Sequence, residues 1–189
     1  KGAGFHTGTQ VVETCGVVCG ETVEVKLLPS VAVKINSLML EFPSLEWLAY
    51  LKGKVEGSDY VVSDLIVPKQ KLAAATVDVD FSEELNLDGV IGSIHSHHTM
   101  GAFFSPQDEA SIVPSYPVSI VVSTKDWACR VRQELPCGNF MAKDAILSVA
   151  TSVNVDTEAF LAAARAKMTT MPTTNFTNYH RAMPTCLSC

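Results

Sequence analysis

The chain has 189 residues, of which 47% are hydrophobic and 18% charged, a composition that predicts a folded core and argues against intrinsic disorder. This length predicts one domain over residues 1–189, with its core at about 23–167 and an irregular, cysteine-containing tail at 168–189. The net charge of −6 comes without a cluster of Lys and Arg, and no apolar run reaches the roughly 18–20 residues of a membrane span, so neither nucleic acid nor a membrane is an expected partner.

The polar first ten residues, Lys1–Gln10, lack the apolar core of a signal peptide, so we expect a cytoplasmic protein. A strand is predicted at Val23–Leu27, and the sequence then favours a helix with Ser30 as its N-cap. Hydrophobic residues recur at helical spacing until Pro43 ends this helix: Val31, Ile35, Leu38, Met39 and Phe42.

The run Trp47–Leu51 is apolar on both faces, which is typical of a central strand covered on each side. The next strand is predicted at Tyr60–Val67, after a cluster of glycine and polar residues. From Pro68 to Asp88 the pattern weakens, and we interpret this stretch as a long, partly extended loop at the edge of the functional site.

The second half of the chain begins with an apolar, strand-like run, Gly89–Ile94, and a short helix is predicted at Pro106–Val113. Further strands are predicted at Val118–Ser123, Trp127–Gln133 and Ala145–Val155, and Asp156 is predicted to cap a helix at Thr157–Lys167. This order of elements favours an α/β fold with a mixed sheet packed by helices on both faces.

The segment from Ile94 to Asp108 contains two pairs of polar residues whose spacing suggests a metal site. His95 and His97 are two residues apart, so on an extended strand both imidazoles point to the same face. Ser105 and Asp108 follow, three residues apart. Two imidazoles and one carboxylate are the three protein ligands of an open zinc site, in which water takes the fourth position.

Each half of this pattern also has an ordinary structural explanation. Ser105, Pro106 and Asp108 make a good helix start, and a His-x-His pair alone is more often structural than ligating. Both halves at this separation, after an apolar strand, are unlikely to coincide by accident. The two interpretations are also compatible, because a helix start places Asp108 where its carboxylate can reach back toward the histidines.

The pattern His-x-His, seven residues, then Ser-x-x-Asp resembles the JAMM signature of the MPN+ zinc metalloproteases, and it matches at every defined position. The resemblance covers about Val23–Lys167 and implies one MPN domain, with a curved mixed sheet like that of cytidine deaminases. It implies that His95, His97 and Asp108 hold Zn²⁺ and that the Ser105 hydroxyl donates a hydrogen bond to the developing oxyanion.

The same resemblance implies a general base upstream, at the end of a helix, with a glycine seven residues later. Glu46 meets this description together with Gly53, and 49 residues separate Glu46 from His95 (95 − 46). Glu13 has the same spacing to a glycine but no preceding helix, so Glu46 is preferred. Glu41 is expected to be a solvated helix residue.

The third imidazole of the signature, His98, falls on the opposite side of an extended strand from His95 and His97. The resembled family does not use this position. We therefore expect His98 to turn away from the metal and to be a structural or rim residue.

Members of the resembled family are mostly isopeptidases that remove ubiquitin or ubiquitin-like modifiers, including the deubiquitinase of the proteasome lid. The resemblance therefore implies a zinc isopeptidase or peptidase that acts on such a modifier, and it leaves a proteasome-type assembly open. Residues 68–88 fall where these enzymes carry an insertion that clamps the modifier's extended tail by strand addition. The alternatives are a silent MPN scaffold and a zinc hydrolase acting on another substrate, such as a sulfur-carrier adduct.

Two further classes fit the sequence less well. A nucleobase deaminase needs His-x-Glu with Pro-Cys-x-x-Cys, and Pro136-Cys137 lacks the second cysteine. A zinc protein built on cysteines alone would leave the His-Ser-Asp set unexplained.

The six cysteines divide into two groups. Cys129 and Cys137 are expected to be buried, inert thiols. The remaining four leave three possibilities open, namely a second zinc site, disulfides or free thiols: Cys15, Cys19, Cys186 and Cys189. A ligand from the C-terminal tail could also occupy the open metal position and block the site.

Overall fold

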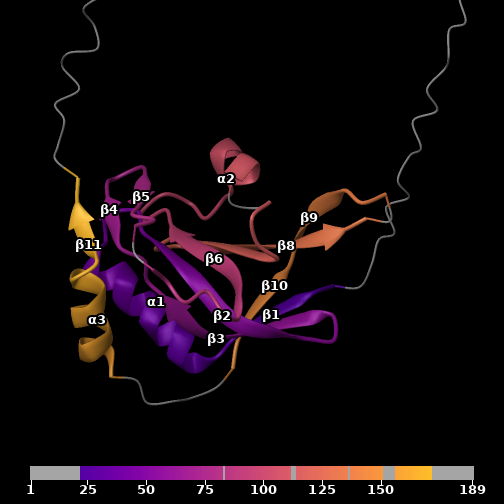
Figure 1. Ribbon diagram of the computed structural model, residues 1–189, viewed down its shortest axis with the longest axis horizontal. Helices are drawn as coiled ribbons and strands as arrows, with labels where there is room; N and C mark the ends of the chain where they lie inside the picture. The colour runs from indigo at the N-terminus through magenta and orange to yellow at the C-terminus, as the bar shows by residue number, and fades with distance from the viewer. Residues whose placement is uncertain (1–21, 83, 112–113, 136, 151–155, 172–189) are drawn as a thin grey trace, which may run out of the picture.

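The computed structural model describes residues 22–82, 84–111, 114–135, 137–150 and 156–171 (Figure 1). Its main element is an eight-stranded sheet in the order β10-β1-β3-β2-β6-β7-β8-β9. The strands are β1 Glu24–Leu27, β2 Leu48–Glu56, β3 Asp59–Ile66, β6 Val90–Ser96, β7 Val118–Val122, β8 Trp127–Glu134, β9 Phe140–Asp144 and β10 Ile146–Val149. β1 runs parallel to both β3 and β10, β6 runs parallel to β7, and the other neighbours are antiparallel.

The sheet curves until its two ends nearly meet. β9 pairs with β8 at one end of the sheet, and β10, which follows β9 directly in the chain, pairs with β1 at the other end. Ala145 lies between β9 and β10, and its N–H donates a hydrogen bond to Cys129 O of β8. The N–O distance is 3.0 Å, a typical length for such a bond. The predicted α/β fold with a curved mixed sheet is therefore confirmed.

The helix α1 (Pro29–Glu41) begins two residues earlier than predicted. Leu28 is its N-cap and Pro29 its first residue, whose missing N–H costs nothing at a helix start. Ser30 is therefore inside the helix, and the prediction of Ser30 as N-cap was wrong. The helix buries Val31 and Ile35, with Leu38 and Met39, against the sheet.

The helix α3 (Thr157–Arg165) packs beside α1 (Figure 1). As predicted, Asp156 caps it, because its side chain accepts a hydrogen bond from Ala159 N at 3.0 Å. Arg165 donates to both carboxylate oxygens of Glu41, so Glu41 is an ion-pair partner rather than only a solvated helix residue.

A hydrophobic core fills the space between α1 and one face of the large sheet. Trp47, Leu51 and Ile94 are fully buried there, from the two central strands that flank the candidate site. Burial of such side chains contributes roughly 1.5–3 kcal/mol each relative to leaving them exposed. The core therefore fixes the ends of β2 and β6, from which the polar residues of the site extend.

A second, three-stranded sheet replaces the loop predicted at 68–88. Its order is β11-β4-β5, with β4 Gln70–Leu72, β5 Val77–Val79 and β11 Met168–Thr170. β4 and β5 form an antiparallel hairpin, and β11 adds to β4 in parallel. The predictions of a loop at 68–88 and of an irregular tail from residue 168 were therefore wrong in part. Residues 172–189 lie outside the described ranges.

Two other boundaries differ from the predictions. β9 was not predicted, because its five residues follow a turn and alternate only weakly. The strand predicted at 145–155 is observed only as β10, and residues 151–155 lie outside the described part of the chain. Within the described ranges, none of the helices combines the length and apolarity that a bilayer crossing requires.

Gly53 marks a close approach of two strands. The register of β2 and β3 shifts between Lys52 and Gly53, and a Cβ atom at Gly53 would lie 2.2 Å from Val61 O. Only glycine fits this bulge without moving β3. The glycine seven residues after Glu46 therefore has a structural role in the strand that carries the site.

Candidate metal centre

The two histidines stand at the end of β6. Ile94 points into the core, so His95 and His97 point to the opposite face, as the strand alternation predicted. His97 lies just beyond the assigned strand, and its N–H donates to Val122 O of β7 at 2.8 Å. The side chains are buried, with residue exposures of 4% for His95 and 5% for His97.

Asp108 reaches the histidines from the first turn of α2 (Pro106–Ser111). Asp108 Oδ2 accepts a hydrogen bond from Ser105 N at 2.7 Å, and Ser105 Oγ accepts one from Asp108 N at 3.2 Å. This reciprocal pair is a capping box with aspartate in the glutamate position. The helix start and the ligand position are thus one structure, as the two compatible interpretations required.

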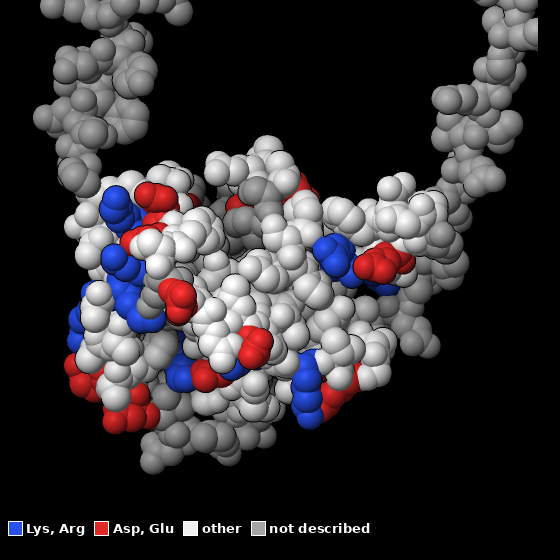
Figure 2. Space-filling model, viewed as in Figure 1, with Lys and Arg blue, Asp and Glu red and all other residues white. Residues whose placement is uncertain are grey.

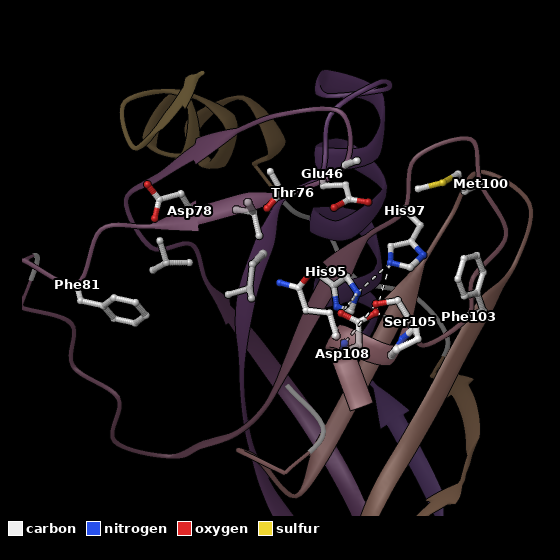
Figure 3. A pocket seen from close by; sticks show the side chains of 16 residues that line it. Glu46, Thr76, Asp78, Phe81, His95, His97, Met100, Phe103, Ser105 and Asp108 are labelled. Carbon is white, nitrogen blue, oxygen red and sulfur yellow. Dashed lines mark hydrogen bonds and ion pairs between the residues drawn. The ribbon is translucent and has the colours of Figure 1, made fainter. Parts of the chain in front are cut away.

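Three ligand atoms converge in the geometry of a small metal site (Figure 3). The Nε2 atoms of His95 and His97 are 3.2 Å apart, His95 Nε2 is 3.3 Å from Asp108 Oδ1, and His97 Nε2 is 3.7 Å from Asp108 Oδ2. Ligand atoms that lie 2.0–2.1 Å from a tetrahedral zinc are about 3.3 Å apart. The three residues therefore form a buried His-His-Asp group positioned to bind a metal ion, which is the cofactor chemistry that the sequence predicted.

The charge states of this group also suit a metal. Burial raises the pKa of Asp108, but the hydrogen bond and charge of His95 and the hydrogen bonds of Ser105 outweigh it and hold the pKa at about 2. Burial and the neighbouring His95 lower the pKa of His97, against the pull of Asp108. An ionised carboxylate and a neutral imidazole are the forms that bind metals.

Glu46 lies beside this group because of the pairing between β2 and β6. Leu48 of β2 is opposite His95, and Trp47 N donates to Ser96 Oγ at 3.1 Å, which brings the residue before Trp47 to the same end of the sheet. Glu46 is 9% exposed, and burial raises the pKa of its carboxyl. In Figure 3 this carboxylate lies on the opposite side of the two imidazoles from Asp108.

The metal-ligand group opens into a pocket of about 830 Å³. One wall comes from the β4–β5 hairpin, including Thr76 and Val77–Val79, and another from the segment that leads to α2. Phe103 of that segment packs edge-on against His97, with ring centroids 5.1 Å apart. Met100 and Phe81 are exposed at the rim, so the entrance is largely apolar.

The sequence did not indicate the residues that attach the hairpin to the site. The Gln70 side chain, 1% exposed, accepts a hydrogen bond from Leu48 N and donates to Leu48 O, and Ala73 O accepts one from Glu46 N. His98 turns away from the metal group, as predicted, but its ring contacts Ala74 O in the hairpin turn. No sequence pattern could have revealed these contacts, since each joins segments at least 22 residues apart.

The cysteines depart from prediction at one position. Cys129 is a buried free thiol, and burial raises its pKa to about 12. Cys137 is exposed and disulfide-bonded, so the prediction that it is a buried thiol was wrong. The alternative base Glu13 and the cysteines of both termini lie outside the described residues.

Comparison with known proteins supports the resemblance noted from the motif. The family model of the prokaryotic homologues of the JAB domain matches residues 7–134, about two thirds of the chain. A comparison with curated proteins gives no match. A solved structure described as "JAMM: A Metalloprotease-like Zinc Site in the Proteasome and Signalosome" is similar at 19% identity over 67% of this chain and 98% of that one, with a TM-score of 0.41.

The family match and the His-His-Asp group together support a JAMM-type metallohydrolase. Every residue of the signature is present, and its three ligand side chains meet at one point. The resemblance to the JAMM/MPN+ family is confirmed: the chain belongs to the prokaryotic homologues of the JAB domain.

Proposed function

We propose that this protein is a zinc-dependent peptidase that cleaves the bond after the extended C-terminal segment of ubiquitin or a ubiquitin-like modifier. The observation that carries the proposal is the convergence of His95, His97 and Asp108 in a pocket that one strand edge borders. A catalytically silent scaffold would not need the complete ligand set. Here all three candidate ligands are buried, and their ligand atoms lie within 4.8 Å of one another.

The Glu46 carboxylate is proposed as the general base. When bound, the metal supplies Lewis-acid activation of water and of the scissile carbonyl. Glu46 accepts the proton of that water and delivers it to the leaving amine. Burial raises the pKa of Glu46, which brings its basicity closer to that of a useful proton acceptor at neutral pH.

The Ser105 hydroxyl is proposed to stabilise the reacting carbonyl. Ser105 lines the pocket next to Asp108, and the capping box fixes its position at the helix start. A hydroxyl held there donates a hydrogen bond to the oxygen on which negative charge develops. Loss of one such donor typically reduces the rate on the order of 10²–10³-fold.

The shape of the pocket supports an extended peptide as substrate. Among the described strands, β5 pairs with β4 alone, so its other edge offers backbone groups that are unpaired within this part of the chain, and Val77–Val79 of this strand line the pocket. An extended segment added to this edge would run toward the metal ligands and could place its apolar side chains against Phe81 and Phe103. A modifier's flexible C-terminal tail has this form.

The face seen in Figure 2 does not present a continuous field of either charge. Lys and Arg are interspersed with Asp and Glu, and much of the surface between them is uncharged. This distribution supports recognition of a peptide through its backbone and apolar side chains.

The proposal is tested by incubating zinc-loaded protein with diubiquitin, with ubiquitin-like precursors and with a sulfur-carrier adduct, and identifying the products by mass spectrometry. We expect cleavage after a modifier tail that stops on addition of a chelator. The matched control is Asp108→Asn, which preserves size but removes the charged ligand. The proposal would be contradicted if only the sulfur-carrier adduct were cleaved, or if every substrate stayed intact with zinc bound to the protein.

A further inference from the structure

His98 has an unusual backbone conformation. Its φ is +35°, and among the described residues it is the one non-glycine residue with a positive φ. This conformation is unfavourable for a residue that carries a side chain, so its surroundings must hold it there. A backbone hydrogen bond helps to hold His98 in place. Thr124 N, in the turn between β7 and β8, donates to His98 O at 2.8 Å.

The side chain of His98 joins two segments that border the pocket. Its Nδ1 accepts a hydrogen bond from Thr99 N at 2.7 Å, so this nitrogen carries no proton. The proton of a neutral ring then lies on Nε2, which is 2.6 Å from Ala74 O and donates to it. The positive φ directs the ring toward the turn of the β4–β5 hairpin.

The hairpin has other attachments at its base and one beside its turn. Gln70 binds the backbone of Leu48 by two hydrogen bonds, and Gln70 N donates to Lys167 O at 2.7 Å, next to β11. Near the turn, Ala73 O accepts from Glu46 N at 2.9 Å. The tip of the hairpin, Ala74–Thr76, is exposed. Among the described residues, His98 is the one whose side chain hydrogen-bonds to this tip.

We propose that His98 is a positioning residue that fastens the tip of the β4–β5 hairpin to the metal-ligand segment, so that β5 stands beside the pocket before substrate arrives. The proposal rests on the proposed function in one respect, namely that substrate binds along β5. A held strand edge loses less conformational entropy on binding than a loop that must first become ordered. His98 would therefore act on substrate affinity rather than on the chemical step.

The first test measures amide hydrogen exchange in the metal-loaded full chain without substrate. The informative variant is His98→Asn, because asparagine tolerates the left-handed conformation but is too short to reach Ala74 O. We expect the amides of residues 73–79 to exchange about three- to tenfold faster, because the variant loses one hydrogen bond that holds the hairpin. His98→Gln, which keeps a long N–H donor, should restore most of the protection. Thr99→Ala, which removes only the hydroxyl contact to His98, should leave it unchanged.

The second test measures cleavage of a modifier-tail substrate by the same variants. We expect His98→Asn to raise KM by a similar three- to tenfold, with kcat within about twofold of the original and one zinc per chain retained. Unchanged exchange in the His98→Asn hairpin would overturn the proposal, as would equal loosening in Thr99→Ala or a fall in kcat at constant KM. If no tested substrate is cleaved by the unmodified protein, the proposed function fails while the exchange result still decides the role of His98.

Discussion

Single side chains at the centre are prepared for metal binding by burial and by their immediate neighbours. The hydrogen bonds of Ser105 and His95 keep Asp108 ionised, while burial favours the neutral imidazole of His97. The pKa of Glu46 shifts in the opposite direction from that of Asp108, because burial raises the pKa of the Glu46 carboxyl. A low-pKa ligand and a higher-pKa base in one pocket are the division of roles that hydrolysis requires.

Replacing Glu46 with Gln is expected to lower kcat by about 10²–10⁴-fold, because the amide cannot accept the proton of water. The three metal ligands are unchanged, so zinc content measured by elemental analysis should stay at one per chain. Glu41→Gln, a matched change on α1, should leave kcat unaltered. Retained turnover in Glu46→Gln would assign the base to another group.

The raised pKa of Glu46 also predicts how the stability of the metal-free protein depends on pH. A carboxyl whose pKa is higher in the folded state than its ordinary 4.5 favours folding while it is protonated. That contribution is lost as the pH rises through the raised value. Metal-free Glu46→Gln should therefore unfold at a higher temperature than the original protein at pH 7, and the difference should shrink at pH 4. Equal melting temperatures at both pH values would contradict this.

At the scale of elements, the site is assembled from the ends of three pieces. β6 provides two ligands, α2 the third, and the start of β2 the candidate base. The hairpin of β4 and β5 closes one side of the pocket. Hydrogen bonds attach the hairpin beside its buried Leu72, and an ion pair attaches α2 to β8, so single substitutions of these polar residues should have measurable effects.

Gln70→Ala should destabilise the fold by about 1–3 kcal/mol, because it removes two hydrogen bonds from the partly buried backbone of Leu48. For a chain of this size each kcal/mol lowers the melting temperature by about 2–4 °C. Lys71→Ala, on the same strand but exposed, is the control and should change stability by less than about 0.5 kcal/mol. Similar melting temperatures for the two variants would show that the Gln70 contacts contribute little.

Arg130→Ala is expected to weaken metal binding by loosening α2. From β8, Arg130 pairs with Glu109 of α2 and with Asp144, and its guanidinium lies 4.8 Å from the centre of the Phe104 ring. These partly exposed pairs are worth about 1 kcal/mol, which corresponds to roughly a fivefold higher dissociation constant for zinc. Arg132→Ala, also on β8, lacks a recorded contact with the described part of α2 and should retain the original affinity. Competition with a chromogenic chelator measures both.

At the scale of the whole molecule, a bound ion would connect α2 to the central strand β6. Asp108 and the histidines belong to segments joined by a crossover between parallel strands. An ion that binds only the folded state stabilises it in proportion to its concentration over its dissociation constant. The metal would therefore support the fold as well as the chemistry.

Chelation should lower the melting temperature of the zinc-loaded protein. With zinc at 100 times its dissociation constant, the loss is about 2.7 kcal/mol, and re-addition of zinc should restore it. Asp108→Asn should show little response to either addition, because one ligand is gone. An identical response in Asp108→Asn would place the stabilising ion elsewhere in the chain.

Local residue patterns were sufficient to predict much of the fold and the candidate site. The helical spacing of Val31, Ile35 and Leu38 predicted α1, and strand alternation placed the imidazoles of His95 and His97 on one face. Such features depend on neighbours within a few residues, which periodicity records directly. The weak stretch at 68–88 has no such period, and its strands form because Gln70 and β11 provide partners from distant segments.

By itself, the sequence identified the candidate ligands, because the His-His-Asp pattern occurs once and its chemistry depends on residue type and spacing. Only the tertiary structure decided where the hairpin stands, how the ends of the sheet nearly close and what His98 contacts. Those outcomes depend on hydrogen bonds such as His98 Nε2 to Ala74 O, which join positions 24 residues apart. The free energy of such contacts exists only when the core has brought both partners together.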